Sequence, residues 1–323
     1  MKSKVGIVGL GWFGSFHLDQ LLTMDDVEVV ALCTANTERI EKAHEKVPHA
    51  KCFSHHKEMI EEMDLDAIYI CVTPSRHEDI ELLAAKKGIA MYIEKPIGLC
   101  LDEVKNIELA ISTSKLIHSV GYQERYSALV GVIQNWLKEE TPVSIRGKWI
   151  DTMPDAPWWR QMHLSGGQVV EQATHIIDMM RYLFGEMEII QSLGVKGYIK
   201  QPNYDVVDAS LSLLYFPRGM IGTLECGCYL DKNQASDIGI EIQGVSSKLV
   251  YHWQQQVVIT KGETEEIYTQ TESSHYRSSR RFIEAVKQQN QSLILSNYSD
   301  ASKTLASTMR INEIMEVKKK EEL

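Results

Sequence analysis

The sequence lacks any long hydrophobic run. No apolar stretch reaches the roughly 20 residues that a transmembrane helix needs, so we expect no membrane partner. Basic residues are also in the minority, because 34 Lys and Arg stand against 44 Asp and Glu, which leaves a formal net charge of -10. This charge disfavours non-specific binding to nucleic acid or to an anionic membrane surface. We therefore expect no nucleic-acid partner either.

Cysteine is scarce and follows no ligand pattern. There are six cysteines in 323 residues, and none forms a C-x-x-C pair. Cys226 and Cys228 alternate along a predicted strand and share one face, but their neighbourhood offers too few further ligands for zinc. We expect free packing cysteines, no bound metal and a reducing, cytoplasmic location.

The first third of the chain alternates strand and helix patterns. The predicted strands are 4–8, 27–33, 66–72 and 90–93, and the predicted helices are 13–24, 37–46, 57–63 and 78–87. Strands that alternate with helices through short links predict a parallel sheet with helices on both faces. Residues 1–121 are therefore expected to form a doubly wound Rossmann domain of the α/β class.

The pattern changes after Gly121. Strands dominate from about 142 to 269, with two predicted hairpins, 206–216 with 220–228 (turned at 217–219) and 238–243 with 248–253. Helices are expected at 168–184, 276–289 and 299–317, followed by a frayed tail at 318–323. Residues 122–323 are thus predicted to form a second α/β domain with an open, mostly antiparallel sheet. Its last helices are free to pack back on the first domain.

A glycine-rich loop, Gly9-Leu10-Gly11-Trp12-Phe13-Gly14, lies between the first strand and the first helix. Gly9 permits a tight turn, Gly11 lets the backbone approach a pyrophosphate, and Gly14 allows close packing of helix and strand. The helix N-terminus, which includes Trp12 and Phe13, offers N–H groups to phosphate. The alternative is a glycine-rich turn without a ligand, but the strand before and the helix after favour a dinucleotide site.

The end of the second strand does not decide between NAD and NADP. An acidic residue is expected there to bind the ribose 2′-hydroxyl, but the position holds Thr34. Asn36 follows, and Arg39 on the next helix could reach a 2′-phosphate or could be a solvated surface charge. The sequence predicts NAD or NADP as cofactor and leaves the choice open.

Two groups of residues carry the predicted chemistry. Glu94-Lys95-Pro96 follows strand 90–93, at the sheet edge where ligands of open α/β sheets bind. Glu171, His175 and Asp178 would share one face of helix 168–184. The alternatives are a surface lysine after a strand and a wet helix face with a salt-bridged histidine.

Ahead of that helix stand Trp158, Trp159 and Arg160. Aromatic rings stack well on sugar rings, and a guanidinium can bind hydroxyl groups. The alternative is that the two tryptophans only pack against the sheet. We name all three as candidate substrate-binding residues.

These motifs together resemble the glucose–fructose oxidoreductase and inositol dehydrogenase family (Gfo/Idh/MocA). The glycine loop, Val72-Thr73-Pro74, Glu94-Lys95-Pro96, Gly121-Tyr122-Gln123 and the Glu171–His175–Asp178 segment occur in the family's order and spacing. The resemblance covers nearly the whole chain. It implies a Rossmann domain, a second domain whose sheet forms a homodimer or homotetramer, and a sugar or polyol substrate.

The resemblance also assigns roles to single residues. Lys95 matches the lysine that moves the hydroxyl proton and binds substrate, and His175 matches the histidine beside the reacting carbon. Glu171 stands where inositol dehydrogenase-like members usually have aspartate, which moves the carboxylate by one methylene. The remaining implied roles are cofactor binding for Thr73, Pro74, His77, Glu94 and Lys95, and substrate binding for Gln123, His175 and Asp178.

The predicted reaction agrees with elementary chemistry. Oxidising a secondary alcohol needs a hydride acceptor and a base for the hydroxyl proton, and a lysine with a histidine–carboxylate pair can provide that base. We predict an NAD(P)-dependent oxidoreductase acting on CH–OH groups of a sugar, sugar derivative or inositol-like polyol. The alternatives are a family member for a dihydrodiol or a linear tetrapyrrole, and a non-catalytic dinucleotide sensor.

Overall fold

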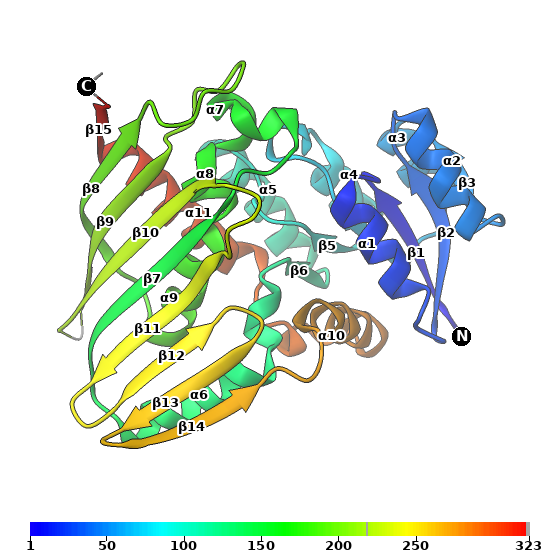
Figure 1. Cartoon of the computed structure of the whole chain (residues 1–323). Coiled ribbons are helices and arrows are strands. Elements are labelled where there is room, and N and C mark those ends of the chain that lie inside the picture. The colour runs from blue at the N-terminus through cyan, green and yellow to red at the C-terminus, as the bar shows by residue number, and fades with distance from the viewer. Residues whose placement is uncertain (218, 321–323) are drawn as a thin grey trace. The chain divides into compact units, whose positions relative to one another are not determined.

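The computed structural model describes residues 1–217 and 219–320 and has an α/β fold with two sheets (Figure 1). The chain divides into two compact units. The first comprises Met1–Gly121 and His275–Ser302, and the second comprises Tyr122–Ser274 and the chain from Lys303 onward. Each unit has its own sheet and its own hydrophobic core.

The first unit contains a six-stranded sheet in the order β3-β2-β1-β4-β5-β6, in which every pairing is parallel. The strands are β1 (Ser3–Val8), β2 (Val27–Cys33), β3 (Lys51–Phe53), β4 (Ala67–Ile70), β5 (Ala90–Ile93) and β6 (His118–Val120). The strand order reverses between β1 and β4. In a doubly wound sheet this switch point opens a crevice at the carboxyl ends of the strands, where ligands bind.

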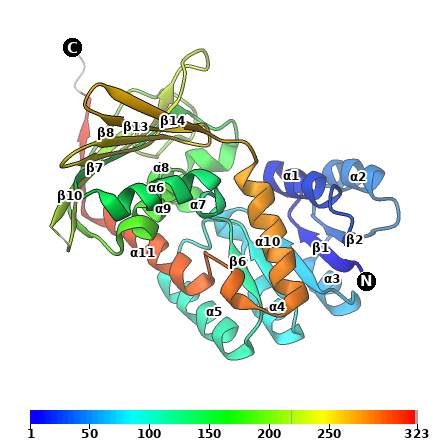
Figure 2. The same ribbon diagram turned by 90° about the horizontal axis from the view of Figure 1, so that it is seen from below.

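Helices cover this sheet on both faces, as the alternating pattern predicts. They are α1 (Trp12–Leu21), α2 (Thr37–Lys46), α3 (His56–Glu62), η1 (Pro74–Arg76), α4 (Ile80–Lys87), α5 (Leu101–Ser114), α10 (Ser274–Gln288) and η4 (Gln291–Leu293). Tyr69 of β4 and Tyr92 of β5 stack with ring centroids 4.8 Å apart, and both contact Phe282 of α10. A helix distant in the sequence thus completes the core of the first unit (Figure 2).

The second unit contains a nine-stranded sheet in the order β14-β13-β12-β11-β7-β10-β9-β8-β15. Only the β7–β10 and β8–β15 pairings are parallel, so the sheet is mostly antiparallel, as expected. The strands are β7 (Pro142–Thr152), β8 (Glu188–Lys196), β9 (Ala209–Phe216), β10 (Met220–Leu230), β11 (Asp237–Gly244), β12 (Lys248–His252), β13 (Gln256–Lys261), β14 (Thr264–Thr269) and β15 (Met315–Lys319).

Helices cover one face of this second sheet (Figure 2). The helices of the unit are η2 (Gln123–Tyr126), α6 (Ala128–Glu139), η3 (Pro157–Arg160), α7 (Met162–Ser165), α8 (Gly167–Glu171), α9 (Thr174–Phe184) and α11 (Tyr298–Ile314), whose first residues belong to the first unit. Buried side chains of α6 and α9 pack on inward-facing residues such as Ile145 and Leu224. Along β9, Leu214 and Phe216 face this core, whereas Leu213 and Tyr215 are exposed on the other face.

The prediction of one continuous helix over 168–184 was wrong. The chain forms α8 and α9 with a break at Gln172 and Ala173, whose N–H groups both donate to the carbonyl of Gln168. Glu171 therefore ends α8, whereas His175 and Asp178 lie on α9. The three side chains come from two short helices rather than from one stripe.

The closing segment also differs from the prediction. The helix expected over 299–317 ends at Ile314, and Met315–Lys319 forms β15, parallel to β8. Lys318 and Lys319 therefore belong to a strand and not to a frayed tail, because pairing with the edge of β8 satisfies their backbone groups. Residues 321–323 of the expected tail, and Arg218 in the expected hairpin turn, lie outside the described residues.

Candidate active site

The glycine loop has the shape that a pyrophosphate requires. Gly9 has φ +86°, and a Cβ there would lie 2.4 Å from the carbonyl oxygen of Cys71. A Cβ on Gly14 would lie 1.8 Å from the carbonyl oxygen of Gly9, so neither position tolerates a side chain. Gly11 differs, because a Cβ there would meet only Nη1 of Arg39, at 3.8 Å. The loop is thus closed toward the sheet and open at Gly11, beside the N-terminus of α1, and it fits a dinucleotide.

An aromatic cluster surrounds this helix N-terminus. Trp12 is 74% exposed and stacks on Phe16, with ring centroids 5.8 Å apart, and Phe13 packs edge-on against both. His275 of α10 joins the cluster at 5.1 Å from Phe16. Burial lowers the pKa of His275 to about 4, which leaves a neutral imidazole at neutral pH. No local signal in the sequence identifies His275, because only the fold brings α10 to the glycine loop.

Three predicted cofactor residues follow β2, and one of them reaches the glycine loop. Asn36 caps α2 by accepting a hydrogen bond from the Arg39 N–H at 2.9 Å, and the Thr34 hydroxyl accepts one from the Asn36 N–H at 3.3 Å. The cap places the Arg39 guanidinium over Gly11. Thr34, Asn36 and Arg39 are thus linked to one another after β2, and their contacts with the adenosine ribose stay a prediction.

Glu94 and Lys95 follow β5 directly and are both buried, with Lys95 only 7% exposed. The Glu94 carboxylate accepts a hydrogen bond from Nε2 of His17, a fully buried residue of α1, at 2.7 Å. Burial would raise the pKa of Glu94, but His17 and the positive charge of Lys95 outweigh it and hold the pKa below its usual value. His17 was not among the residues predicted from sequence, where its only signal is its place on the apolar face of the helix.

The segment after β4 carries three predicted cofactor contacts. Thr73 is half-buried and precedes η1, which begins at the buried Pro74. His77 is buried, and its Nδ1 is bonded to the carboxylate of Glu81 on α4. Burial lowers the pKa of His77, but the negative charge of Glu81 outweighs this and raises it overall. Glu81 engages Nδ1 and not Nε2, so a direct cofactor contact by the ring stays a prediction.

In the second unit, His175 lies in an aromatic setting. Its ring stacks on Trp149 of β7, with centroids 5.4 Å apart and an interplanar angle of 19°, and Tyr122 and Trp253 pack around it. His175 is 7% exposed, and Glu171 at the end of α8 is half-buried. These contacts hold the imidazole plane in a defined orientation, as a proton-transfer group requires.

Asp178 has a different environment. Its two carboxylate oxygens accept hydrogen bonds from Nε and Nη2 of Arg125 at 2.7 and 2.6 Å, and Thr304 donates a third at 2.9 Å. Both Asp178 and Arg125 are almost fully buried. Burial raises the pKa of the Asp178 carboxyl against the lowering effect of Arg125. The substrate contact predicted for Asp178 stays a prediction, and its bonds favour a structural role.

The remaining substrate candidates are either buried or half-buried. Trp159 is 1% exposed and belongs to the hydrophobic core, which favours the packing alternative over stacking on a sugar ring. Trp158 is half-buried against the same core, and Arg160 is half-buried. Gln123 is buried in η2. Sequence could not separate the two adjacent tryptophans, because a short 3-10 helix turns them in different directions.

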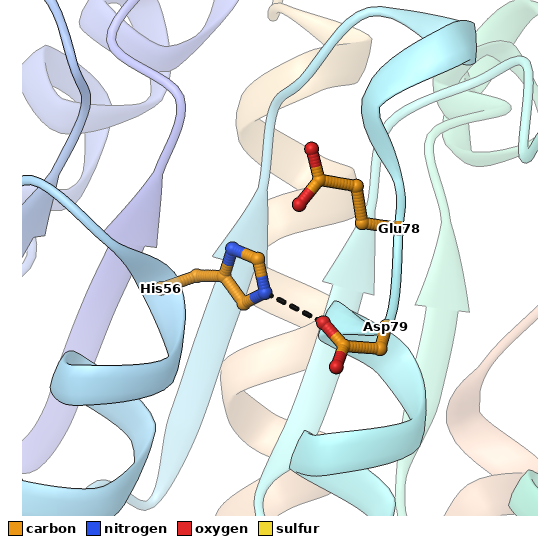
Figure 3. Close-up of side chains that lie close together, drawn as sticks. All are labelled: His56, Glu78 and Asp79. Carbon is orange, nitrogen blue, oxygen red and sulfur yellow. Dashed lines mark hydrogen bonds and ion pairs between the residues drawn. The ribbon is translucent and has the colours of Figure 1, made fainter.

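Three potential metal ligands also lie together, in the first unit (Figure 3). His56, Glu78 and Asp79 offer ligand atoms within 4.8 Å of one another. Nε2 of His56 lies 2.8 Å from one Asp79 oxygen, and Nζ of Lys57 lies 3.1 Å from the other. The imidazole and the ammonium already pair with Asp79, so the cluster joins the starts of α3 and α4 without needing an ion.

Among residues 1–217 and 219–320, no helix combines the length and apolar character required to cross a membrane. This finding concerns helices alone.

Two family models match the chain. Residues 3–122 match the model described as "Oxidoreductase family, NAD-binding Rossmann fold", and residues 141–250 match the GFO/IDH/MocA C-terminal domain. The first matched segment contains the glycine loop and Lys95, and the second contains His175.

Individual relatives agree with these models. Myo-inositol 2-dehydrogenase of Thermotoga maritima is 25% identical over 69% of this chain and 67% of its own length. Levoglucosan dehydrogenase of Pseudarthrobacter phenanthrenivorans is 23% identical over 78% and 74%. A structure of levoglucosan dehydrogenase with NADH has a TM-score of 0.84 at 19% identity, covering 97% of this chain and 96% of that one. A 3-ketoreductase from Actinomadura kijaniata with TDP-benzene and NADP has a TM-score of 0.86 at 15% identity, covering 99% of this chain and 100% of that one.

Proposed function

Because the chain belongs to the Gfo/Idh/MocA family of NAD(P)-dependent oxidoreductases, we propose that it acts on a sugar, a sugar derivative or an inositol-like polyol. It would transfer a hydride between a nicotinamide dinucleotide and the hydroxyl or carbonyl carbon of that substrate. The observation that carries this proposal is the position of Lys95, which follows β5 on the same sheet whose glycine loop fits a pyrophosphate.

Each candidate residue then has a definite task. The cofactor supplies the chemistry of hydride acceptance or donation. Neutral Lys95 takes the hydroxyl proton during oxidation, and the ammonium that this forms stays hydrogen-bonded to the substrate oxygen. His175, oriented by its stack on Trp149, and the carboxylate of Glu171, close to it in the sequence, then pass this proton on to water. No step requires a metal ion.

A polyol is preferred to the other substrate classes because Lys95 and His175 are both present and because relatives are named as inositol and levoglucosan dehydrogenases. The alternatives are a dihydrodiol, a linear tetrapyrrole, or a sensor that binds dinucleotide without turnover. The test is a panel of inositols, sugars, anhydrosugars, a dihydrodiol and a tetrapyrrole, assayed by nicotinamide absorbance with NAD and NADP in parallel. Turnover confined to a non-carbohydrate would contradict the proposed substrate, and tight cofactor binding without any turnover would favour the sensor.

Arg39 leads us to propose a preference for the 2′-phosphorylated cofactor. Its guanidinium lies over Gly11, and the position of the usual ribose-binding carboxylate holds Thr34, so a phosphate would meet a cation and no repelling acid. Arg39→Ala should weaken NADPH binding about tenfold or more and change NADH binding little, as lost charge-assisted hydrogen bonds predict. Fluorescence titration of each reduced cofactor measures this. Lys42→Ala, on the same helix, is the control, and equal losses for both cofactors would refute the preference.

The face of the second sheet that carries no helices supports a proposed homo-oligomer. Exposed apolar side chains of adjacent strands lie side by side on it, since Leu193 pairs with Leu211 and Tyr215 pairs with Ile221. Leu213 lies between these pairs on β9 and is also exposed. Contiguous apolar surface of this kind marks an interaction site, and a second copy of the chain presents the same self-complementary surface. We propose a homodimer or homotetramer.

Leu211→Glu should dissociate this assembly. Leu211 is 52% exposed and has Leu193 and Glu225 as its register partners, so a second carboxylate would place two like charges side by side in the interface. Size-exclusion chromatography with light scattering should show the monomer mass. Leu109→Glu replaces a leucine of α5 that is 66% exposed, and it should leave the mass of the assembly unchanged. A wild-type monomer would refute the proposal outright.

The cysteines support a proposed location. All six are free thiols, and four of them, Cys33, Cys71, Cys226 and Cys228, are buried with pKa values raised by burial. Such thiols are unreactive packing groups that persist in a reducing compartment. We therefore place the protein in the cytoplasm.

A further inference from the structure

Glu94 is held from three sides within the first unit. Its N–H donates to the carbonyl of Ile70 on β4 at 2.9 Å, which makes it the last residue tied to the sheet before Lys95. Nε2 of His17 donates to its carboxylate from α1 at 2.7 Å. On the third side lies Gly121. A Cβ built on Gly121 would lie 2.7 Å from one carboxylate oxygen of Glu94 and 2.9 Å from the other. The carboxylate therefore fills the space that any side chain at position 121 would take.

The partners of His17 identify the role of each ring nitrogen. Nε2 faces the Glu94 carboxylate, which only accepts, and Nδ1 faces the hydroxyl of Ser279 on α10 at 3.5 Å. A ring that donates from Nε2 and accepts at Nδ1 satisfies both contacts without carrying a charge. Tyr69 and Tyr92 pack against the ring at 5.2 and 5.1 Å and leave it fully buried. His17 is thus shielded from solvent, and its hydrogen bond to Glu94 links it to the residue that precedes Lys95.

From these contacts we propose that His17 is a positioning residue for Lys95 and acts through Glu94. This inference rests on the proposed function, in which Lys95 moves the hydroxyl proton. His17 pulls the Glu94 carboxylate against Gly121, and this fixes the backbone from which Lys95 projects. The ionised carboxylate also balances the charge of Lys95 in a buried site. A proton-transfer group must be held to well under an ångström, because a misplacement of about 1 Å can cost roughly 100-fold in rate.

Two variants that differ by one methylene test the proposal. The amide nitrogen of His17→Gln can occupy the place of Nε2 and donate to Glu94, whereas the amide of His17→Asn is too short to reach it. We expect His17→Gln to keep kcat within about threefold of wild type and His17→Asn to lose about 10- to 100-fold, with cofactor affinity unchanged in both. Equal kcat values for the two variants would overturn the proposal.

A third variant acts on Glu94 without touching His17. In Gly121→Ala the new Cβ meets only the far end of a flexible side chain, so the chain should fold while the carboxylate moves. We expect the same loss of kcat as in His17→Asn, and crystal structures of both variants should show Lys95 Nζ displaced. Undisplaced Lys95 in both structures would overturn the proposal even if no substrate had been found.

The outcome separates this inference from the proposed function. If Lys95→Ala retained wild-type turnover, the proposed function itself would fail. If Lys95→Ala were inactive while His17→Asn and Gly121→Ala kept full kcat, only the positioning role of His17 would fail. Ser279→Ala is a matched control, because it removes the longer contact of His17 and keeps the bond to Glu94.

Discussion

Lys95→Ala is expected to lower kcat by at least about 100-fold and to leave cofactor affinity within about threefold of wild type. In the proposed mechanism the amine accepts the hydroxyl proton and then holds the substrate oxygen as an ammonium, whereas the phosphates of the cofactor would bind to the glycine loop. Steady-state kinetics with the substrate found in the panel gives kcat, and fluorescence titration of the reduced cofactor gives affinity.

The control for this experiment is Lys86→Ala, which removes an exposed lysine of α4 in the same unit. It should change neither quantity. Unchanged kcat in Lys95→Ala would remove Lys95 from the mechanism. A large loss of cofactor affinity with kcat preserved would instead assign Lys95 to cofactor binding alone.

Asp178→Ala is expected to lower the free energy of unfolding by about 3–5 kcal/mol. The substitution leaves the guanidinium of Arg125 buried without its bidentate partner, and Thr304 loses its acceptor. A buried charge without compensation is among the most destabilising changes a single substitution can make. Denaturant unfolding followed by tryptophan fluorescence measures the change in the second unit, to which both residues belong.

The matched control removes an exposed ion pair. Asp237 pairs with Lys148 at 3.0 Å on the surface of the second sheet, and Asp237→Ala should cost less than about 1 kcal/mol because water screens such pairs. If Asp178 binds substrate, as the family resemblance implies, Asp178→Ala would raise KM strongly and change stability no more than the control does. These two readouts therefore separate a structural role from a substrate contact.

Local chemistry predicted much of the first unit. The glycine loop, the strand before it and the helix after it follow from residue types within one short stretch, and the structure places Gly9 and Gly14 where no side chain fits. Lys95 follows directly on a strand of the parallel sheet. Each of these predictions depends on neighbours in the sequence, so a local sequence pattern was sufficient to make it.

Other predictions failed because they depend on distant partners. The break between α8 and α9 at Gln172 contains no Gly or Pro. The sequence pattern therefore predicted a single helix with Glu171, His175 and Asp178 on one face. Met315–Lys319 continues a helical pattern and becomes a strand only because β8 offers it an open edge. Trp158 and Trp159 are the same residue type, so the sequence cannot distinguish them. In the structure Trp159 is buried in the core and Trp158 is only partly buried against it.

The sequence by itself determined the alternation of strands and helices in the first unit and the dinucleotide loop. Backbone conformation and hydrophobic periodicity are local properties, so these features follow from the order of the residues alone. The tertiary structure alone decided that Arg39 lies over Gly11, that His17 and Gly121 hold Glu94, and that Asp178 is paired with Arg125. Each of these is a contact between segments far apart in the chain, and its energy comes from burial that only the folded core provides.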